Sequence, residues 1–191
     1  MGRSTSPYQG RSLERYSSFR DYPSFGCGSF ALRAFRTEGV LPLSLDETWD
    51  LLHAHVDEDR LRKIHPRIIS GQSLRESEVV EFQGLTFPRE KVAERVIRIG
   101  GRPTRSTWTY RIEPPNRYAY EVVFPNGSIL QVDNTYSSFE GATLVKTSGA
   151  VSLKRVPSFL AVWIVKRLFS RSDREDFGYA KRMNRPTARS P

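Results

Sequence analysis

Four polar side chains lie on alternating, strand-like segments in the second half of the chain and could do chemistry on a bound molecule. Tyr110 and Tyr120 carry phenolic hydroxyls, and each shares its parity with apolar neighbours. Asn134 carries an amide and Thr147 a hydroxyl, again beside apolar residues of the same parity. Small-molecule sites are mostly apolar and fix the ligand with a few such groups, so these four could orient a ligand or serve as acid and base. The alternative is that they are satisfied polar groups of the core or of a strand's solvent face.

Metal and cofactor chemistry have less support in the sequence. His53 and His55 are two residues apart on an expected helix, so they point in different directions and do not share a metal ion in the i, i+4 manner. The single cysteine, Cys27, stands between two glycines in an expected tail. The chain also has no G-x-S-x-G, no glycine-rich phosphate loop before a helix and no C-x-x-C. We therefore expect neither a metal ion nor a cofactor.

Three carboxylates stand near the polar candidates but on the opposite parity. Glu113, Glu121 and Asp133 alternate with the apolar residues of their segments, so their side chains are expected to point outward. This parity argues against a buried carboxylate pair and against hydrolysis of the two-carboxylate type.

Residues 104–153 combine strand-like alternation with a large aromatic area. Trp108, Tyr110, Tyr118, Tyr120 and Phe124 share one parity, and a second apolar set follows on residues 130–136. An apolar molecule is expected to bind against these faces, although tryptophans such as Trp108 and Trp163 more often pack in a core than contact a ligand. The predicted ligand-binding residues are Trp108, Tyr110, Tyr120, Val122, Leu130, Val132, Asn134, Tyr136, Thr147 and Trp163.

The elements that must position these residues can be predicted from patterns of spacing. Residues 30–43 are expected to form a first strand. Ser44 and Glu47 have the spacing of a capping box, and the following apolar residues fall on one face of a helix. A second short helix is expected from Asp57 and must end at Pro66. Seven further strands are predicted at residues 68–77, 79–87, 91–99, 104–113, 118–124, 128–139 and 143–153.

Turn signals separate most of these strands, and successive strands joined by tight turns pair antiparallel. The turns are predicted at Gly100-Gly101, Pro114-Pro115-Asn116, Asn126-Gly127 and Glu140-Gly141. The strand at 79–87 has the weakest pattern, because Gly84 and Pro88 both interrupt it and either could mark a bulge or an edge.

A C-terminal helix is predicted to begin at Pro157, where the first turn of a helix tolerates proline. Residues 159–165 are apolar on every side of such a helix, so this part is buried all round, inserted in a partner, or in contact with an apolar ligand or a membrane. Ser172 and Glu175 form a second capping-box pattern, which leaves open a kink or a break near Ser170 to Ser172.

The chain has 191 residues, which is near the size of one domain. We expect one domain at residues 30–183 and two disordered tails, at 1–29 and 184–191, because the tails have too few apolar residues to offset the entropy of ordering. A lone cysteine suits a reducing, cytoplasmic setting. No apolar stretch approaches the roughly 20 residues that cross a bilayer, and the N-terminus lacks the apolar core of a secretory signal. The expected location is cytoplasmic, with peripheral membrane contact as an option.

The net charge of +9 would favour a polyanionic partner. Residues 154–171 and 181–191 contain basic residues and no acid, and together they account for the whole excess. A solvated helix face and a basic tail would explain this equally well. Nucleic acid is not the expected partner, because the aromatic residues look internal and therefore do not offer platforms for stacking bases.

The predicted order of one strand, two short helices, a long antiparallel meander and a closing helix resembles a known arrangement. It is similar to the α+β helix-grip fold of the SRPBCC superfamily, which includes START proteins, polyketide cyclases and birch-pollen-allergen-like proteins. The matching motifs are the capped helix at residues 43–52, His65-Pro66, the turn at residues 114–117, the turn at residues 140–143 and the closing helix. The resemblance implies a curved sheet of about seven strands wrapped around the C-terminal helix. It also implies a cavity for lipids, sterols, polyketides or similar molecules, and no catalytic residue shared by all members.

Three functions are compatible with this sequence. The favoured one is binding or transport of a lipid-like or polyketide-like small molecule between the sheet and the closing helix. The second is a cyclase or dehydratase on the same fold. The third is a surface-associated interaction protein, in which Lys154, Arg155, Lys166 and Arg167 contact an anionic membrane or an acidic partner. The oligomeric state is not predicted by any of these patterns.

Overall fold

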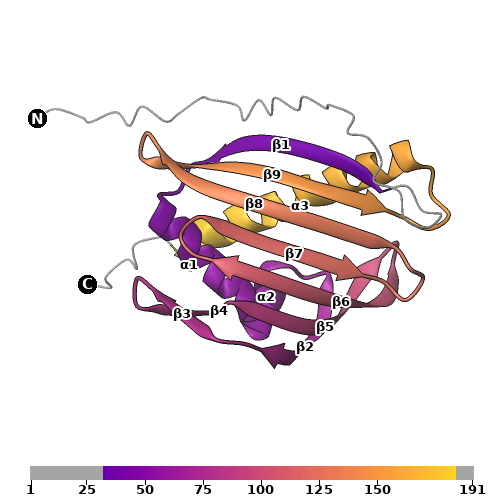
Figure 1. The fold of residues 1–191 in the computed structure, drawn as a ribbon, viewed down its shortest axis with the longest axis horizontal. Coiled ribbons are helices and arrows are strands. Elements are labelled where there is room, and N and C mark those ends of the chain that lie inside the picture. The colour runs from indigo at the N-terminus through magenta and orange to yellow at the C-terminus, as the bar shows by residue number, and fades with distance from the viewer. Residues whose placement is uncertain (1–31, 184–191) are drawn as a thin grey trace, which may run out of the picture.

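The computed structural model describes residues 32–183, and the predicted tails and Cys27 lie outside them. A seven-stranded antiparallel sheet, in the order β1-β9-β8-β7-β6-β5-β2, forms one layer, and the helices lie behind it (Figure 1). The elements are β1 (Arg33–Leu41), α1 (Leu45–Val56), α2 (Glu58–Ile64), β2 (Ile68–Glu76), β3 (Val79–Phe82), β4 (Leu85–Pro88), β5 (Glu90–Ile99), β6 (Arg102–Glu113), β7 (Arg117–Val123), β8 (Ile129–Phe139), β9 (Ala142–Ser152) and α3 (Ser158–Met183). The α+β helix-grip architecture predicted from the sequence is therefore confirmed.

The capping box at Ser44 is present as predicted and sets the start of α1. The Glu47 backbone N–H donates to Ser44 Oγ at 3.2 Å, and the Ser44 N–H donates back to Glu47 Oε2 at 2.8 Å. The cap fixes the phase of α1, so that Trp49 and Leu52 face the sheet and are buried. The Trp49 indole packs against Phe87, with ring centroids 5.3 Å apart, and against Tyr136 at 5.7 Å. This contact holds α1 on the sheet.

The hairpin between β8 and β9 shows why the meander folds where the sequence predicts it. Glu140 and Gly141 both have positive φ, 49° and 77°, as a two-residue turn of the primed type requires. The turn sets a register in which Tyr136 pairs with Val145 and Asn134 pairs with Thr147. Alternate residues of these strands then face the helices.

The segment 79–87 does not form one strand, and that prediction is wrong. Gln83 and Gly84 adopt φ values of 53° and 75° and turn the chain back on itself. Two short strands, β3 and β4, result, and they pair with each other outside the main sheet. Gly84 therefore marks a hairpin rather than a bulge or an edge.

α3 is one uninterrupted helix of 26 residues, so the predicted alternative of a break near Ser170 to Ser172 is wrong. The two residues of the second capping-box pattern have other partners. Ser172 Oγ accepts a hydrogen bond from the Arg67 guanidinium at 3.3 Å, and Glu175 pairs with His65. Both side chains therefore hold the middle of α3 against the end of α2. Within residues 32–183, no helix is long and apolar enough to span a membrane.

Candidate functional site

The helix-facing side of β6 and β7 carries a cluster of four aromatic rings. The register places Tyr110 opposite Tyr120 and Trp108 opposite Val122. The ring centroids of Trp108 and Tyr120 are 5.7 Å apart, as are those of Tyr110 and Tyr118. These separations lie in the range of favourable aromatic contacts. The alternation in the sequence therefore brings the aromatic rings together on one face.

Nine of the ten predicted ligand-binding residues lie on this helix-facing side of the sheet. Four are buried in the core: Tyr110, Val122, Val132 and Tyr136. The other five are partly buried: Trp108, Tyr120, Leu130, Asn134 and Thr147. The backbone of α3 comes closest to β1, β9 and α2 rather than to the middle strands. The five partly buried side chains therefore keep some exposure on a face that the helix covers.

Trp163 is the tenth residue, and its expected position in the interior is wrong. Its side chain is 56% exposed on the outer side of α3, beneath the Arg167 guanidinium, whose carbon lies 5.6 Å from the centre of the indole ring. Ala161 and Val165 are the buried α3 residues of this stretch, and the partly buried Val162 packs against the same cluster. The apolar run of α3 is thus not buried all round, because Leu160 and Trp163 are exposed whereas Ala161 and Val165 are buried.

The predicted polar pair Asn134 and Thr147 is joined by a hydrogen bond. The Thr147 hydroxyl donates to Asn134 Oδ1 at 2.7 Å, across the β8–β9 pair. A hydrogen bond from Asn134 also favours the charged form of Tyr136, although burial and the nearby Asp176 and Asp173 raise the pKa of that hydroxyl more. These groups form a short polar strip at the edge of the aromatic cluster.

The tyrosine hydroxyls of the interior stay protonated at neutral pH. Burial raises the pKa of Tyr110 to about 12, against the opposing effect of Arg95. Burial and the neighbouring Tyr110 raise the pKa of Tyr118 and Tyr120 well above its usual range. Such hydroxyls can donate a hydrogen bond to a ligand, but they do not serve as bases.

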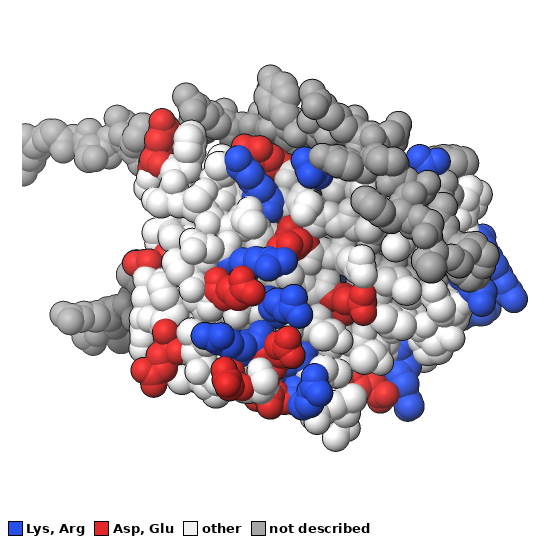
Figure 2. Space-filling model, viewed as in Figure 1, with Lys and Arg blue, Asp and Glu red and all other residues white. Residues whose placement is uncertain are grey.

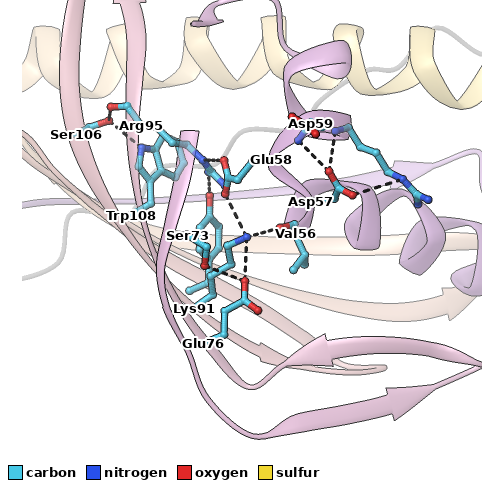
Figure 3. A network of polar contacts seen from close by, with 12 residues as sticks. Val56, Asp57, Glu58, Asp59, Ser73, Glu76, Lys91, Arg95, Ser106 and Trp108 are labelled. Atoms are coloured by element: carbon cyan, nitrogen blue, oxygen red, sulfur yellow. Dashed lines mark hydrogen bonds and ion pairs between the residues drawn. The ribbon is translucent and has the colours of Figure 1, made fainter. Parts of the chain in front are cut away.

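A buried charge network borders the aromatic cluster (Figure 3). Arg95 on β5 is 1% exposed and binds both carboxylate oxygens of Glu58, with Nε to Oε2 at 2.8 Å and Nη2 to Oε1 at 2.7 Å. It also donates to the Tyr110 hydroxyl, and its guanidinium carbon lies 4.9 Å from the centre of the Trp108 ring. Lys91 Nζ lies 3.2 Å from the same Glu58 carboxylate. The charges thus hold the edge of the aromatic cluster in place.

The sequence did not predict this network, although one signal was present. Lys91 and Arg95 have the same parity as Ala93, and all three side chains are buried on the helix-facing side of β5. Cations at a buried parity require a carboxylate partner. Glu58 could not be chosen as that partner from sequence, because it lies on α2, 37 residues before Arg95.

The outer face of the sheet carries paired charges (Figure 2). Arg117 binds Asp133 at 2.9 and 2.7 Å and lies 3.7 Å from Glu113, and Gln131 donates to Glu121 at 2.7 Å. The prediction that these three carboxylates point outward is therefore confirmed. A hollow of about 610 Å³ opens on this face, with Arg111, Arg117, Glu121 and Asp133 in its lining. Three of the predicted ligand-binding residues, Tyr110, Tyr120 and Val132, also line this hollow, together with Phe35 and Ala119.

No protein-family model matches the sequence, and a search of curated proteins finds no match. The fold does match solved structures. The Zhui aromatase/cyclase from Streptomyces sp. R1128 is 13% identical with a TM-score of 0.59, and the match covers 82% of this chain and 98% of that one. Ara h 8.0201 is 21% identical with a TM-score of 0.58, covering 78% and 98% of the two chains. A STAR-related lipid transfer protein fragment from Xanthomonas axonopodis is 14% identical with a TM-score of 0.55, covering 82% and 90%.

All three neighbours have SRPBCC-type structures. The chain therefore shares the helix-grip fold of these neighbours, as the resemblance in the sequence implied. At these levels of identity the likeness establishes the fold and leaves the ligand and the activity to other arguments.

Proposed function

We propose that this chain binds an apolar small molecule between the helix-facing side of the sheet and α3. The observation that carries the proposal is the partial exposure of Trp108, Tyr120 and Leu130 on the covered face of the sheet. Apolar and aromatic side chains that stay accessible at such a place are the kind of lining that apolar ligands bind. The nearby pair Asn134 and Thr147 offers polar groups that would orient the ligand.

Binding without chemistry is favoured over a cyclase or dehydratase. An enzyme of that kind needs at least two polar groups that converge on one point of the substrate. Asn134 and Thr147 point at each other, and the interior tyrosines are poor bases. Among the structural neighbours, one is described as a lipid transfer protein and another as an aromatase/cyclase, so the neighbours support an apolar ligand and leave both alternatives open.

Binding of a fluorescent fatty acid tests the proposal. Wild-type protein is expected to bind cis-parinaric acid saturably and to release an apolar molecule on organic extraction, as detected by mass spectrometry. Leu130→Trp fills the space beside Tyr120 and should weaken cis-parinaric acid binding by about tenfold, or ~1.4 kcal/mol.

Trp163→Ala is the matched control, because its side chain is exposed on the other side of α3. It should leave the binding of cis-parinaric acid unchanged. Equal affinities of Leu130→Trp and wild type would contradict the proposed site. A wild-type protein that neither binds the probe nor releases an apolar molecule would contradict the function itself.

A second candidate function is contact of α3 with an anionic membrane surface. Leu160, Trp163 and Leu168 are exposed large apolar residues on the outer side of α3. The Arg167 guanidinium lies over the Trp163 ring, so apolar and cationic groups meet in one place. A helix with such a face can lie in the interfacial region of a bilayer. Among the predicted basic residues, Arg167 belongs to this surface.

Vesicle co-sedimentation tests this second function. The chain is expected to bind vesicles that contain phosphatidylserine more strongly than vesicles of phosphatidylcholine alone, and less strongly at high salt. Trp163→Ala should lower vesicle binding by about tenfold, because the indole supplies the largest apolar area of the exposed face. Leu74→Ala, at an exposed apolar residue of β2, is the control. Equal loss in both variants, or binding that ignores salt, would exclude this mode of contact.

A further inference from the structure

Two histidines and a carboxylate from three different elements lie close together where α1, α2 and α3 meet. His55 lies in the last turn of α1, His65 caps the C-terminus of α2, and Asp176 lies on α3. Asp176 Oδ1 is 3.1 Å from His55 Nε2 and 3.3 Å from His65 Nε2. One ligand atom from each residue lies within 4.8 Å of the other two. The three atoms therefore surround one point.

A fourth residue fixes the orientation of His65. Its Nδ1 lies 2.9 Å from Glu175 Oε2, and Glu175 also binds the Arg171 guanidinium at 3.0 Å and lies 3.6 Å from that of Arg67. A carboxylate held by two guanidinium groups is an acceptor, so the Nδ1 of His65 is the donor in this pair. The lone pair of a neutral His65 is then on Nε2 and faces the Asp176 carboxylate. Two acceptors 3.3 Å apart repel each other unless a proton or a metal ion lies between them.

This arrangement has the parts of a transition-metal site. Metal-bound histidines usually donate their other ring N–H to a carboxylate, which sets the tautomer and the ring orientation. Bonds of about 2.0–2.1 Å at tetrahedral angles separate two ligand atoms by ~3.3 Å, and the two contacts of Asp176 are 3.1 and 3.3 Å. The side chains of all three residues are largely buried, with exposures between 11% and 21%.

We propose that His55, His65 and Asp176 bind a divalent first-row transition-metal ion, with Glu175 as the residue that positions His65. Two imidazoles and one carboxylate suit Zn²⁺ or Fe²⁺ and leave at least one coordination position for water or an oxygen of a ligand.

The sequence-based expectation of no metal ion rested on the spacing of His53 and His55 and on the lone cysteine in an expected tail. The second histidine of this site is His65, which follows the break between two short helices and so could not be placed by helical spacing. Asp176 is 121 residues from His55 in the chain. A useful signal was that His55 and His65 each stand at the end of one of two consecutive helices.

The test is Zn²⁺ binding to untagged, full-length protein after treatment with a chelator and desalting. Isothermal titration at pH 7.5 is expected to give one ion per chain, and the ion should raise the melting temperature. His55→Gln and Asp176→Asn should weaken Zn²⁺ binding by at least 100-fold. Glu175→Gln should weaken it by about tenfold, at the lower end of the 10–100-fold range for residues that orient a metal ligand.

His53→Gln is the matched control, because it removes another α1 histidine whose ring packs on Phe87 instead. It should bind Zn²⁺ as the wild type does. Histidine NMR of the wild type gives an independent readout should a variant fail to fold: Zn²⁺ should shift the ring nitrogens of His55 and His65 and leave those of His53 in place. Absence of Zn²⁺ binding, equal binding by His53→Gln and His55→Gln, or no shift at His65 would overturn the proposal and leave an ion-pair cluster.

Discussion

Replacing Glu58 with glutamine is expected to lower the free energy of unfolding by about 3–5 kcal/mol, the usual cost of removing one partner of a buried ion pair. The substitution leaves Arg95, which is 1% exposed, and Lys91, which is 3% exposed, without their shared carboxylate. Because Arg95 also holds Tyr110 and lies over Trp108, the loss should loosen the aromatic face as well. Urea denaturation, followed by tryptophan fluorescence and circular dichroism, measures the effect.

Asp59→Asn is the matched control for this experiment. Asp59 lies on the same helix and pairs with Arg62, but its side chain is 77% exposed. Exposed ion pairs contribute about 0–1 kcal/mol, so the control should change the free energy of unfolding very little. A cost for Glu58→Gln no greater than that for Asp59→Asn would contradict a stabilising role of the buried pair.

The same pair predicts the sign of the pH dependence. Burial pushes the pKa of Glu58 up, but the hydrogen bonds and charge of Arg95, together with Lys91, hold it below its ordinary value of 4.5. The unfolded chain therefore binds this proton more tightly than the folded one. The stabilisation is fully present above the unfolded pKa and is lost as the pH falls through the lower, folded pKa. The difference in stability between wild type and Glu58→Gln should therefore shrink as the pH is lowered from 6 through the acidic range.

Patterns that depend on near neighbours in the chain were predictable from sequence. The Ser44 capping box and the Glu140-Gly141 turn need only residues within a few positions, and both are present. Strand parity likewise placed Tyr110 and Tyr136 on the covered face and Asp133 on the outer one. The order of such local elements was enough to predict the helix-grip fold.

Features that depend on contacts between distant segments were not predictable. The capping pattern at Ser172 and Glu175 failed because Arg67 and His65, more than 100 residues earlier, provide partners for these side chains. Trp163 was misplaced because an apolar run around a helix does not specify which side faces the sheet. The Glu58–Arg95 pair and the histidine cluster arise in the same way, from elements that meet only in the folded chain.

Replacing Gly149 with alanine is expected to lower the free energy of unfolding by about 3 kcal/mol or more. Gly149 lies on β9, between Phe35 of β1 and Val132 of β8. A Cβ at this position would lie 2.3 Å from the Gln131 carbonyl oxygen and 2.5 Å from Phe35 Cζ. Overpacking a tight core typically costs about 1–3 kcal/mol, and here one of the two obstacles is backbone that cannot move without breaking the β8–β9 ladder.

Phe35 cannot relieve this clash cheaply. Its ring is 2% exposed and packs against Phe169 of α3, with ring centroids 5.7 Å apart. A displaced Phe35 ring would push on α3, so the substitution should also disturb the packing of α3 against the sheet. The affinity of folded Gly149→Ala protein for cis-parinaric acid should therefore differ from that of the wild type. If the substitution disturbed only β9, this affinity would stay unchanged.

Gly39→Ala is the matched control, since Gly39 is also a strand glycine and no atom lies within 4 Å of its added Cβ. Its effect should stay within about 0.5 kcal/mol of wild type, as for surface substitutions generally. Thermal and urea unfolding of the two alanine variants measure the contrast. Equal stability of Gly149→Ala and Gly39→Ala would contradict the close contact between Phe35 and β9. It would also contradict the packing of α3 against this part of the sheet.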